Sequence, residues 1–286
     1  MAPTGTSMEA YNGHEVPKVA SIKTLADSAA LTFVPSEYTY TKNPNEQGDA
    51  NDPEHSIPIL IFPFSHQDLL INEQKDFLKV IVHPQFNSLY KPAGYSEVSL
   101  EFSKRTREVA TEMLKGISES LGLEGHYIVK AMNWDRGLQI LAANYYPACP
   151  QPDKAIGLPP HTDHGLVTLL IQNEMGGLEV KHKDQWVLVN VAPGAFVVTI
   201  GDQMQILTKD KYKSIWHRAV VNNKATRISI AVPRGPSLDT PALPIPELLE
   251  REGQAPKYIG MTYEKFIASP AALIKPFLDH LRVKHN

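Results

Sequence analysis

A histidine and a carboxylate stand two positions apart in His161-Thr162-Asp163. On an extended strand, side chains two positions apart point to the same face. A second histidine on a neighbouring strand, such as His217, would complete a set of two imidazoles and one carboxylate. Such a set binds one face of an octahedral metal ion, suits Fe(II) and leaves the other positions open. Because the chain has 11 histidines, the short string alone is weak evidence, and His217 could equally be a packed structural histidine.

Polar residues also recur at alternate positions of otherwise apolar segments. Arg227 and Ser229 form one such pair, and Asn144 and Tyr146 form another. Polar side chains that face a core are costly unless they find partners, so the pattern predicts a polar-lined pocket. Taken singly, Arg227 could pair with a surface carboxylate, Ser229 could fill a strand, and Tyr146 could be a core residue. Four further residues are interpreted as surface, turn or core residues: His164, His182, Asp202 and Cys149.

The region from Leu138 onward consists of short apolar runs separated by Gly, Pro, Asn and Asp, which is typical of a sandwich or jelly roll. Asn222-Asn223 lies between two of these runs and predicts a hairpin, which would put Arg227 roughly opposite His217. The expected strands are Leu138–Tyr146, Leu166–Gln172, Leu178–His182, Trp186–Val191, Phe196–Ile200, Ser214–Val221 and Arg227–Val232.

The clearest helix is expected over Glu101–Leu123, with an apolar stripe that covers a sheet. The stripe comprises Phe102, Val109, Met113, Ile117 and Leu121. Further helices are expected over Ser21–Ala30, Tyr127–Met132, Tyr263–Ala268 and Ala271–Arg282, a short strand over Ile57–Phe62, and an irregular connector over Pro233–Pro246.

The composition is that of an ordinary globular chain, with 42% apolar residues and a net charge of −3. This charge balance gives no electrostatic footprint for nucleic acid or an anionic membrane. We see no apolar run of membrane-spanning length and no signal peptide. The single Cys149 excludes an internal disulfide and a cysteine-rich zinc site. We therefore expect a cytoplasmic protein, and a monomer, that binds neither nucleic acid nor membranes.

Five strings in combination resemble the plant iron(II)/2-oxoglutarate-dependent dioxygenases, the relatives of flavonoid, alkaloid and gibberellin oxygenases. They are Asn144-Tyr-Tyr-Pro-Ala-Cys-Pro, His161-Thr-Asp-His-Gly-Leu-Val-Thr-Leu-Leu, Gly201-Asp-Gln, His217-Arg-Ala-Val and Arg227-Ile-Ser. The resemblance runs from about Asp76 to the C-terminus. It implies a mainly β fold with flanking helices, built on a double-stranded β-helix, that is, a cupin-like jelly roll.

The resemblance also implies roles for the residues that match the motifs. His161, Asp163 and His217 would bind Fe(II) and form the catalytic centre. The distal carboxylate of 2-oxoglutarate would be held by Arg227 and Ser229, with Tyr146 assisting and Asn144 near the chelating end. The implied reaction uses O2, releases succinate and CO2, and hydroxylates or desaturates a small organic substrate, with ascorbate as reductant.

This chain departs from the family in its N-terminal region. The family usually carries strings close to Gly-Phe-Phe and Asn-His-Gly there, and neither occurs in this sequence. We therefore expect a disordered tail over 1–17, a truncated helical region over 18–136, the jelly-roll core over 137–234, and a connector with helices over 235–286.

Two alternatives to an active oxygenase stay open. One is an impaired isoform that binds metal and 2-oxoglutarate without productive turnover, which the shortened N-terminal region suggests. The other is a zinc hydrolase with the same ligands, which is disfavoured because the sequence contains no His-Glu-x-x-His string.

Overall fold

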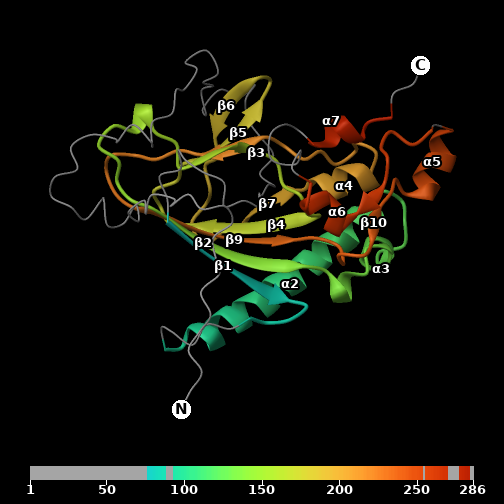
Figure 1. Ribbon diagram of the computed structural model, residues 1–286, viewed down its shortest axis with the longest axis horizontal. Helices are drawn as coiled ribbons and strands as arrows, with labels where there is room; N and C mark the ends of the chain where they lie inside the picture. The colour runs from blue at the N-terminus through green and yellow to red at the C-terminus, as the bar shows by residue number, and fades with distance from the viewer. Residues whose placement is uncertain (1–75, 88–92, 254, 270–276, 284–286) are drawn as a thin grey trace, which may run out of the picture.

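The computed structural model describes residues 76–87, 93–253, 255–269 and 277–283 (Figure 1). The expected tail over 1–17, the helix over Ser21–Ala30 and the strand over Ile57–Phe62 lie outside the described residues.

Two antiparallel sheets form the centre of the molecule, the smaller above the larger in Figure 1. They share one apolar core, in which Leu169 of the larger sheet packs with Leu178 and Val180 of the smaller. The larger sheet has the order β1 (Asp76–His83), β2 (Gln139–Tyr146), β9 (Arg227–Arg234), β4 (Val167–Gln172) and β7 (Val197–Ile200). The smaller has the order β3 (Leu158–His161), β8 (His217–Ala219), β5 (Leu178–His182) and β6 (Gln185–Leu188). The expected mainly β jelly roll is confirmed.

Two of these strands were not predicted. Strand β1 extends the larger sheet from a region expected to be helical, and it pairs with β2. Strand β3 contains Pro159 and Pro160, which cannot donate to a ladder. It lies at the edge of the smaller sheet among the described strands, where missing N–H groups are tolerated. The prolines therefore concealed a strand that ends at His161.

The predicted hairpin at Asn222-Asn223 is wrong. Strand β8 pairs with β3 and β5, whereas β9 pairs with β2 and β4 in the other sheet. The segment is still a tight turn, because Asn222 Oδ1 accepts hydrogen bonds from the N–H groups of Lys224 and Ala225 at 2.8 and 2.9 Å. It carries the chain from one sheet of the jelly roll to the other, so Arg227 does not lie opposite His217.

Helix α2 (Tyr95–Ser120) lies below the larger sheet in Figure 1 and buries a face rich in small and hydroxyl residues. Thr106 and Ala110 are buried on this face. The Thr106 hydroxyl donates to Phe102 O at 2.8 Å, so it needs no partner outside the helix. The expected apolar stripe is wrong at Val109, which is 44% exposed. The buried face was predicted from apolar residues alone. Because this face contains buried serine and threonine residues, the prediction missed part of it.

Most of the remaining elements gather at one end of the sandwich (Figure 1). Near Pro233–Pro246, where a connector was expected, the structure has the end of β9 and a short strand. Of the helix expected over Ala271–Arg282, the described part is α7. None of the described helices is long and apolar enough to cross a membrane. The elements at this end are α3 (Tyr127–Ala131), η4 (Trp134–Arg136), α4 (Asp202–Leu207), β10 (Pro241–Ala242), α5 (Pro246–Glu252), β11 (Met261–Thr262), α6 (Tyr263–Ile267) and α7 (Phe277–Leu281), whereas the short helix η5 (Pro152–Lys154) lies at the opposite end.

Candidate metal centre

His161, Asp163 and His217 converge at one end of the smaller sheet. His161 ends β3 and lies directly opposite His217, the first residue of β8. Asp163 follows two positions later, in the loop that leads to β4. The candidate ligand atoms of the three side chains all lie within 4.8 Å of one another. The structure therefore brings together the three residues that the sequence predicts as metal ligands.

Both imidazoles present their Nε2 atoms to the same point. Nδ1 of His161 lies 2.7 Å from Pro159 O, and Nδ1 of His217 lies 2.9 Å from Ile215 O. Because a carbonyl oxygen only accepts, each Nδ1 carries the proton and each Nε2 carries a lone pair. Burial lowers the pKa of His217 to about 4, so this ring is neutral near pH 7. The two Nε2 atoms are 2.8 Å apart, close to the ~3 Å expected for nitrogen ligands at adjacent positions of an octahedral ion.

Asp163 offers one carboxylate oxygen that has no hydrogen-bond partner in the described part of the chain. Its Oδ2 accepts from the hydroxyls of Thr199 at 3.0 Å and Thr168 at 3.3 Å. Its Oδ1 is buried and has no hydrogen-bond partner among the described residues. Burial, together with the nearby charge of Asp202, holds the pKa of Asp163 well above its ordinary value. A divalent cation at Oδ1 would satisfy this oxygen and favour the ionised form, so the residues fit a metal ion.

Asp202 is a buried residue of the site that the sequence analysis assigned no role. It begins α4, and its N–H donates to Asp163 O at 2.6 Å. Its Oδ2 accepts from the Thr162 hydroxyl at 3.3 Å. Burial raises the pKa of Asp202 to about 7. Asp202 therefore holds the loop that carries Asp163. The Gly201-Asp-Gln string was the sequence signal that could have identified Asp202.

Arg227 is a buried cation on β9 whose neighbours come from three strands. It lies opposite Tyr146 of β2, and the guanidinium carbon is 4.8 Å from the centre of the Tyr146 ring. Its Nη1 donates to Ser229 Oγ at 3.3 Å, and its Nη2 donates to Gln172 Oε1 of β4 at 2.8 Å. The strand pairing places Asn144 opposite Ser229. The predicted polar group therefore exists, with Gln172 as a member that the sequence analysis missed.

No carboxylate of the described residues forms an ion pair with Arg227. The side chain is 1% exposed, and its Nε has no partner among the described residues. Burial lowers the pKa of Arg227, which shows that the charged form is poorly solvated. A buried cation without an anion is costly, so the arrangement suits a ligand that brings its own carboxylate. The alternative of a surface ion pair is excluded for this arginine.

Tyr146 links the arginine to the strands of the metal centre. Its ring belongs to a small core cluster with Leu158 of β3 and Ala219 of β8. A Cβ at Gly157 would lie 2.7 Å from the Tyr146 ring and 3.1 Å from Ala219 O, so this approach requires glycine. The cation and the metal ligands therefore share one interior between the two sheets.

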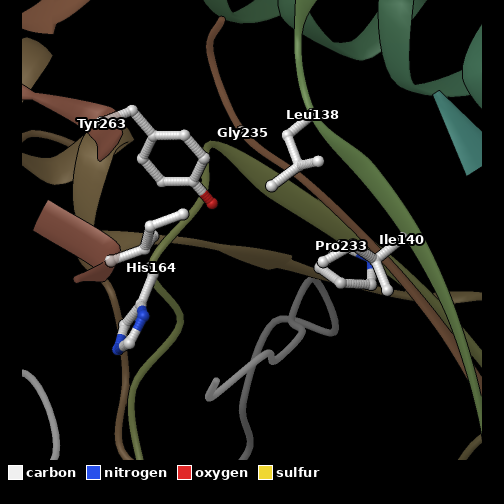
Figure 2. Close-up of a pocket in the computed structure, with 7 residues that line it drawn as sticks. Leu138, Ile140, His164, Pro233, Gly235 and Tyr263 are labelled. Atoms are coloured by element: carbon white, nitrogen blue, oxygen red, sulfur yellow. The ribbon is translucent and has the colours of Figure 1, made fainter. Parts of the chain in front are cut away.

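A cavity of about 20 Å³ lies beside the loop of Asp163 (Figure 2). In Figure 2, Tyr263 and Leu138 point toward one another across it, while the imidazole of His164 points away from Tyr263. His164 packs edge-on against Phe266, with the ring centres 5.5 Å apart. The cavity is lined by Leu138, Ile140, His164, Pro233, Gly235, Tyr263 and Ile267.

Comparison with known proteins assigns the domain. Residues 137–236 match the sequence model of the 2OG-Fe(II) oxygenase superfamily. This chain carries a 2OG-Fe(II) oxygenase domain. The match spans β2 to β9, and it contains both histidines, Asp163 and Arg227.

The oxygenase domain has plant relatives. The chain is 42% identical over 217 residues to 2-oxoglutarate-dependent dioxygenase 19 of Oryza sativa subsp. japonica, which covers 74% of this chain and 64% of that protein. It is 42% identical over 176 residues to flavonol synthase/flavanone 3-hydroxylase of Petunia hybrida, covering 62% and 50%. The chain thus spans between half and two thirds of the lengths of these relatives.

Solved structures share the fold of this chain. The structure of JOX2 in complex with 2OG, Fe and JA has a TM-score of 0.77 at 23% identity, covering 93% of this chain and 98% of that one. The dioxygenase for auxin oxidation in rice has a TM-score of 0.63 at 20% identity, covering 92% and 85%.

Proposed function

We propose that this chain is an Fe(II)- and 2-oxoglutarate-dependent oxygenase that hydroxylates or desaturates a small organic substrate and releases succinate and CO2. One observation carries the proposal: a His-Asp-His set, in which Asp163 and His217 are buried, shares an interior with a buried arginine. Among the described residues, neither Oδ1 of Asp163 nor the charge of Arg227 finds a partner of its own. The match to the 2OG-Fe(II) oxygenase superfamily supports it.

The chain's own residues would hold and orient the metal. His161, Asp163 and His217 would be its ligands, through two Nε2 atoms and Oδ1. The Nδ1 contacts to Pro159 O and Ile215 O fix the orientation of both rings. When bound, Fe(II) supplies the redox chemistry that couples O2 and 2-oxoglutarate to oxidation of a substrate C–H bond, and ascorbate would keep it reduced.

The buried arginine would anchor the co-substrate. Arg227 and the Ser229 hydroxyl would hold the distal carboxylate of 2-oxoglutarate, a charge-assisted contact worth about 1.5–3 kcal/mol. The Tyr146 ring would support the guanidinium from one face, and Asn144 would lie near the chelating end. The jelly-roll core over 137–234 would be the unit that carries all these residues.

The substrate would be a small organic molecule. The identity with the Petunia flavonol synthase/flavanone 3-hydroxylase makes flavanones the first substrates to test. A role in plant specialised metabolism is part of this proposal.

The test is anaerobic addition of Fe(II) and then 2-oxoglutarate, followed by exposure to O2. We expect a weak visible charge-transfer band on 2-oxoglutarate binding, and succinate formation that an added flavanone stimulates. A band without O2 consumption or succinate would favour the alternative, a protein that binds metal and co-substrate without productive turnover. The absence of both the band and succinate would overturn the proposal.

A further inference from the structure

The turn between β4 and β5, residues 172–177, surrounds the start of β9. It contacts three parts of Arg227: the guanidinium, the backbone on both sides, and the aliphatic stem. Each contact comes from a different residue of the turn. The sequence of the turn is Gln172-Asn173-Glu174-Met175-Gly176-Gly177.

Gln172 contacts the guanidinium. Its Oε1 accepts from Nη2 of Arg227 at 2.8 Å, the shortest hydrogen bond that the guanidinium makes among the described residues. An amide oxygen accepts a hydrogen bond but carries no charge. Gln172 therefore takes up one N–H group and leaves the positive charge uncompensated.

Asn173 fixes the backbone on both sides of Arg227. Its Nδ2 donates to Thr226 O at 2.9 Å, and its Oδ1 accepts from the N–H of Ile228 at 3.1 Å. The N–H of Asn173 also donates to Ile228 O at 3.0 Å. One side chain next to Gln172 thus holds the peptide groups that precede and follow the arginine.

Gly177 contacts the stem. A Cβ at this position would lie 3.2 Å from Cδ of Arg227 and 2.8 Å from Val220 O, and the φ of Gly177 is +98°. Both the space and the backbone conformation therefore require glycine. The backbone of the turn at Gly177 therefore packs closely against the aliphatic stem of Arg227.

These contacts decide which edge of the guanidinium faces the interior. Gln172 occupies Nη2, Ser229 accepts from Nη1 at the longer distance of 3.3 Å, and Nε has no partner among the described residues. A guanidinium binds a carboxylate in a fork only when two adjacent N–H groups are presented together. Nη2 carries two N–H groups and belongs to both fork-forming edges, the one shared with Nε and the one shared with Nη1. The single Nη2 N–H group that Gln172 takes up therefore determines which of these edges is left for a ligand.

We propose that the turn over residues 172–177 is a positioning device for the co-substrate anchor, in which Gln172 fixes the rotation of the Arg227 guanidinium. This inference rests on the proposed function for the identity of the ligand. Gln172 acts through Arg227, and its neutrality is part of the role. A carboxylate in its place would neutralise the arginine and repel a dicarboxylate ligand.

The first experiment measures 2-oxoglutarate affinity by calorimetry, anaerobically and with Mn(II) in the metal site. Gln172→Met removes the acceptor, and we expect the Kd for 2-oxoglutarate to rise about tenfold while Mn(II) affinity stays unchanged. Gln172→Glu should weaken 2-oxoglutarate more than Gln172→Met does. The matched controls, Gln185→Met and Gln185→Glu on β6, make the same chemical changes at a site without a side-chain hydrogen bond in the described structure. Wild-type affinity in Gln172→Met would overturn the proposal.

The second experiment needs no co-substrate. In metal-free protein labelled with ¹⁵N-arginine, we expect the Arg227 guanidinium to rotate slowly about its Cζ–Nε bond, and faster in Gln172→Met. Arg218, whose Nε donates to Glu179 at 2.6 Å, is the internal reference and should be unaffected. Equal rotation rates in both proteins would contradict the positioning role. A wild-type protein that holds the guanidinium rigid but binds no 2-oxoglutarate would instead contradict the proposed function.

Discussion

Tyr146 lies directly opposite Arg227 across the β2–β9 pair, and its ring centre is 4.8 Å from the guanidinium carbon. The aromatic face offsets part of the cost of burying the charge, and contacts of this kind are worth about 0.5–2 kcal/mol. The same ring packs against Ala219 near the metal ligands. One aromatic side chain thus supports both halves of the candidate site.

Two replacements of Tyr146 distinguish the contribution of its ring from that of its hydroxyl. We expect Tyr146→Leu to weaken 2-oxoglutarate binding severalfold and to lower the unfolding temperature, because the ring contact with the cation is lost. Tyr146→Phe keeps the ring and should retain most of the affinity. Calorimetry with Mn(II) measures both variants. If Tyr146→Phe and Tyr146→Leu bound the co-substrate equally, the ring would have no part in the anchor.

Replacement of Arg227 should affect the co-substrate and spare the fold. We expect Arg227→Met to raise the Kd for 2-oxoglutarate about 10- to 100-fold, because charge-assisted hydrogen bonds are lost. Stability of the ligand-free protein should be maintained or increased, since a buried charge without a carboxylate partner is removed. Calorimetry and urea unfolding measure the two effects. Unchanged affinity would remove Arg227 from the binding site.

Replacement of Asp163 should abolish metal binding. We expect Asp163→Ala to retain no Fe(II) or Mn(II) after desalting, because the three-residue set loses its only anionic ligand. Metal content by elemental analysis measures this. Asp153→Ala in the short helix η5 is a matched control and should keep a full complement of metal. Stoichiometric Fe(II) in Asp163→Ala would contradict the ligand assignment.

Metal binding should stabilise the folded chain. A ligand at 100 times its Kd that binds only the native state adds about 2.7 kcal/mol. We therefore expect chelation of the metal to lower Tm by several degrees, and added Mn(II) to restore it. Thermal unfolding at several Mn(II) concentrations measures the effect. Independence of Tm from metal in a protein shown to bind it would mean that the site also forms in the unfolded chain.

Acid should destabilise the protein partly through Asp210. Burial raises the pKa of this carboxyl, but hydrogen bonds from Tyr258, Lys257 and Gln205 outweigh it and lower the pKa to about 2. Because the folded pKa lies below the ordinary value of 3.8, the carboxylate contributes stability above that pH, and the contribution is lost as pH falls toward 2. We expect Asp210→Asn to be less stable at neutral pH and to lose less stability between pH 4 and pH 2. Urea unfolding of the metal-free proteins measures the slopes, and identical slopes would show that Asp210 has no part in acid unfolding.

Local patterns predicted most strands, whereas the three candidate ligands were singled out by the resemblance to the dioxygenases. Leu178–His182 occurs as predicted, because alternation along a half-buried strand is a local property. The partner of a strand is not local, and so β8 and β9 were wrongly paired across Asn222. The buried face of α2 was misplaced at Val109 because Thr106 satisfies its own hydroxyl and can be buried.

The sequence analysis missed two residues of the site, and each of them positions another residue. Gln172 and Asp202 carry no metal-ligand or catalytic signature, and their significance lies in contacts to Arg227 and Asp163 that only the folded chain brings together. Asp202 could have been identified from the Gly201-Asp-Gln string. Gln172 could not have been identified from the sequence, because polar residues are common at the ends of strands.

His161 and His217 lie directly opposite one another in neighbouring strands. Iron binding therefore depends on the alignment of β3 with β8. If β8 slipped by one residue along β3, the side chain of His217 would turn to the other face of the sheet and the set would lose a ligand. Chains with this misalignment would purify with the remaining sheet intact and yet retain no iron. The ratio of metal to protein in a preparation therefore reports the fraction of molecules that have folded in the correct register.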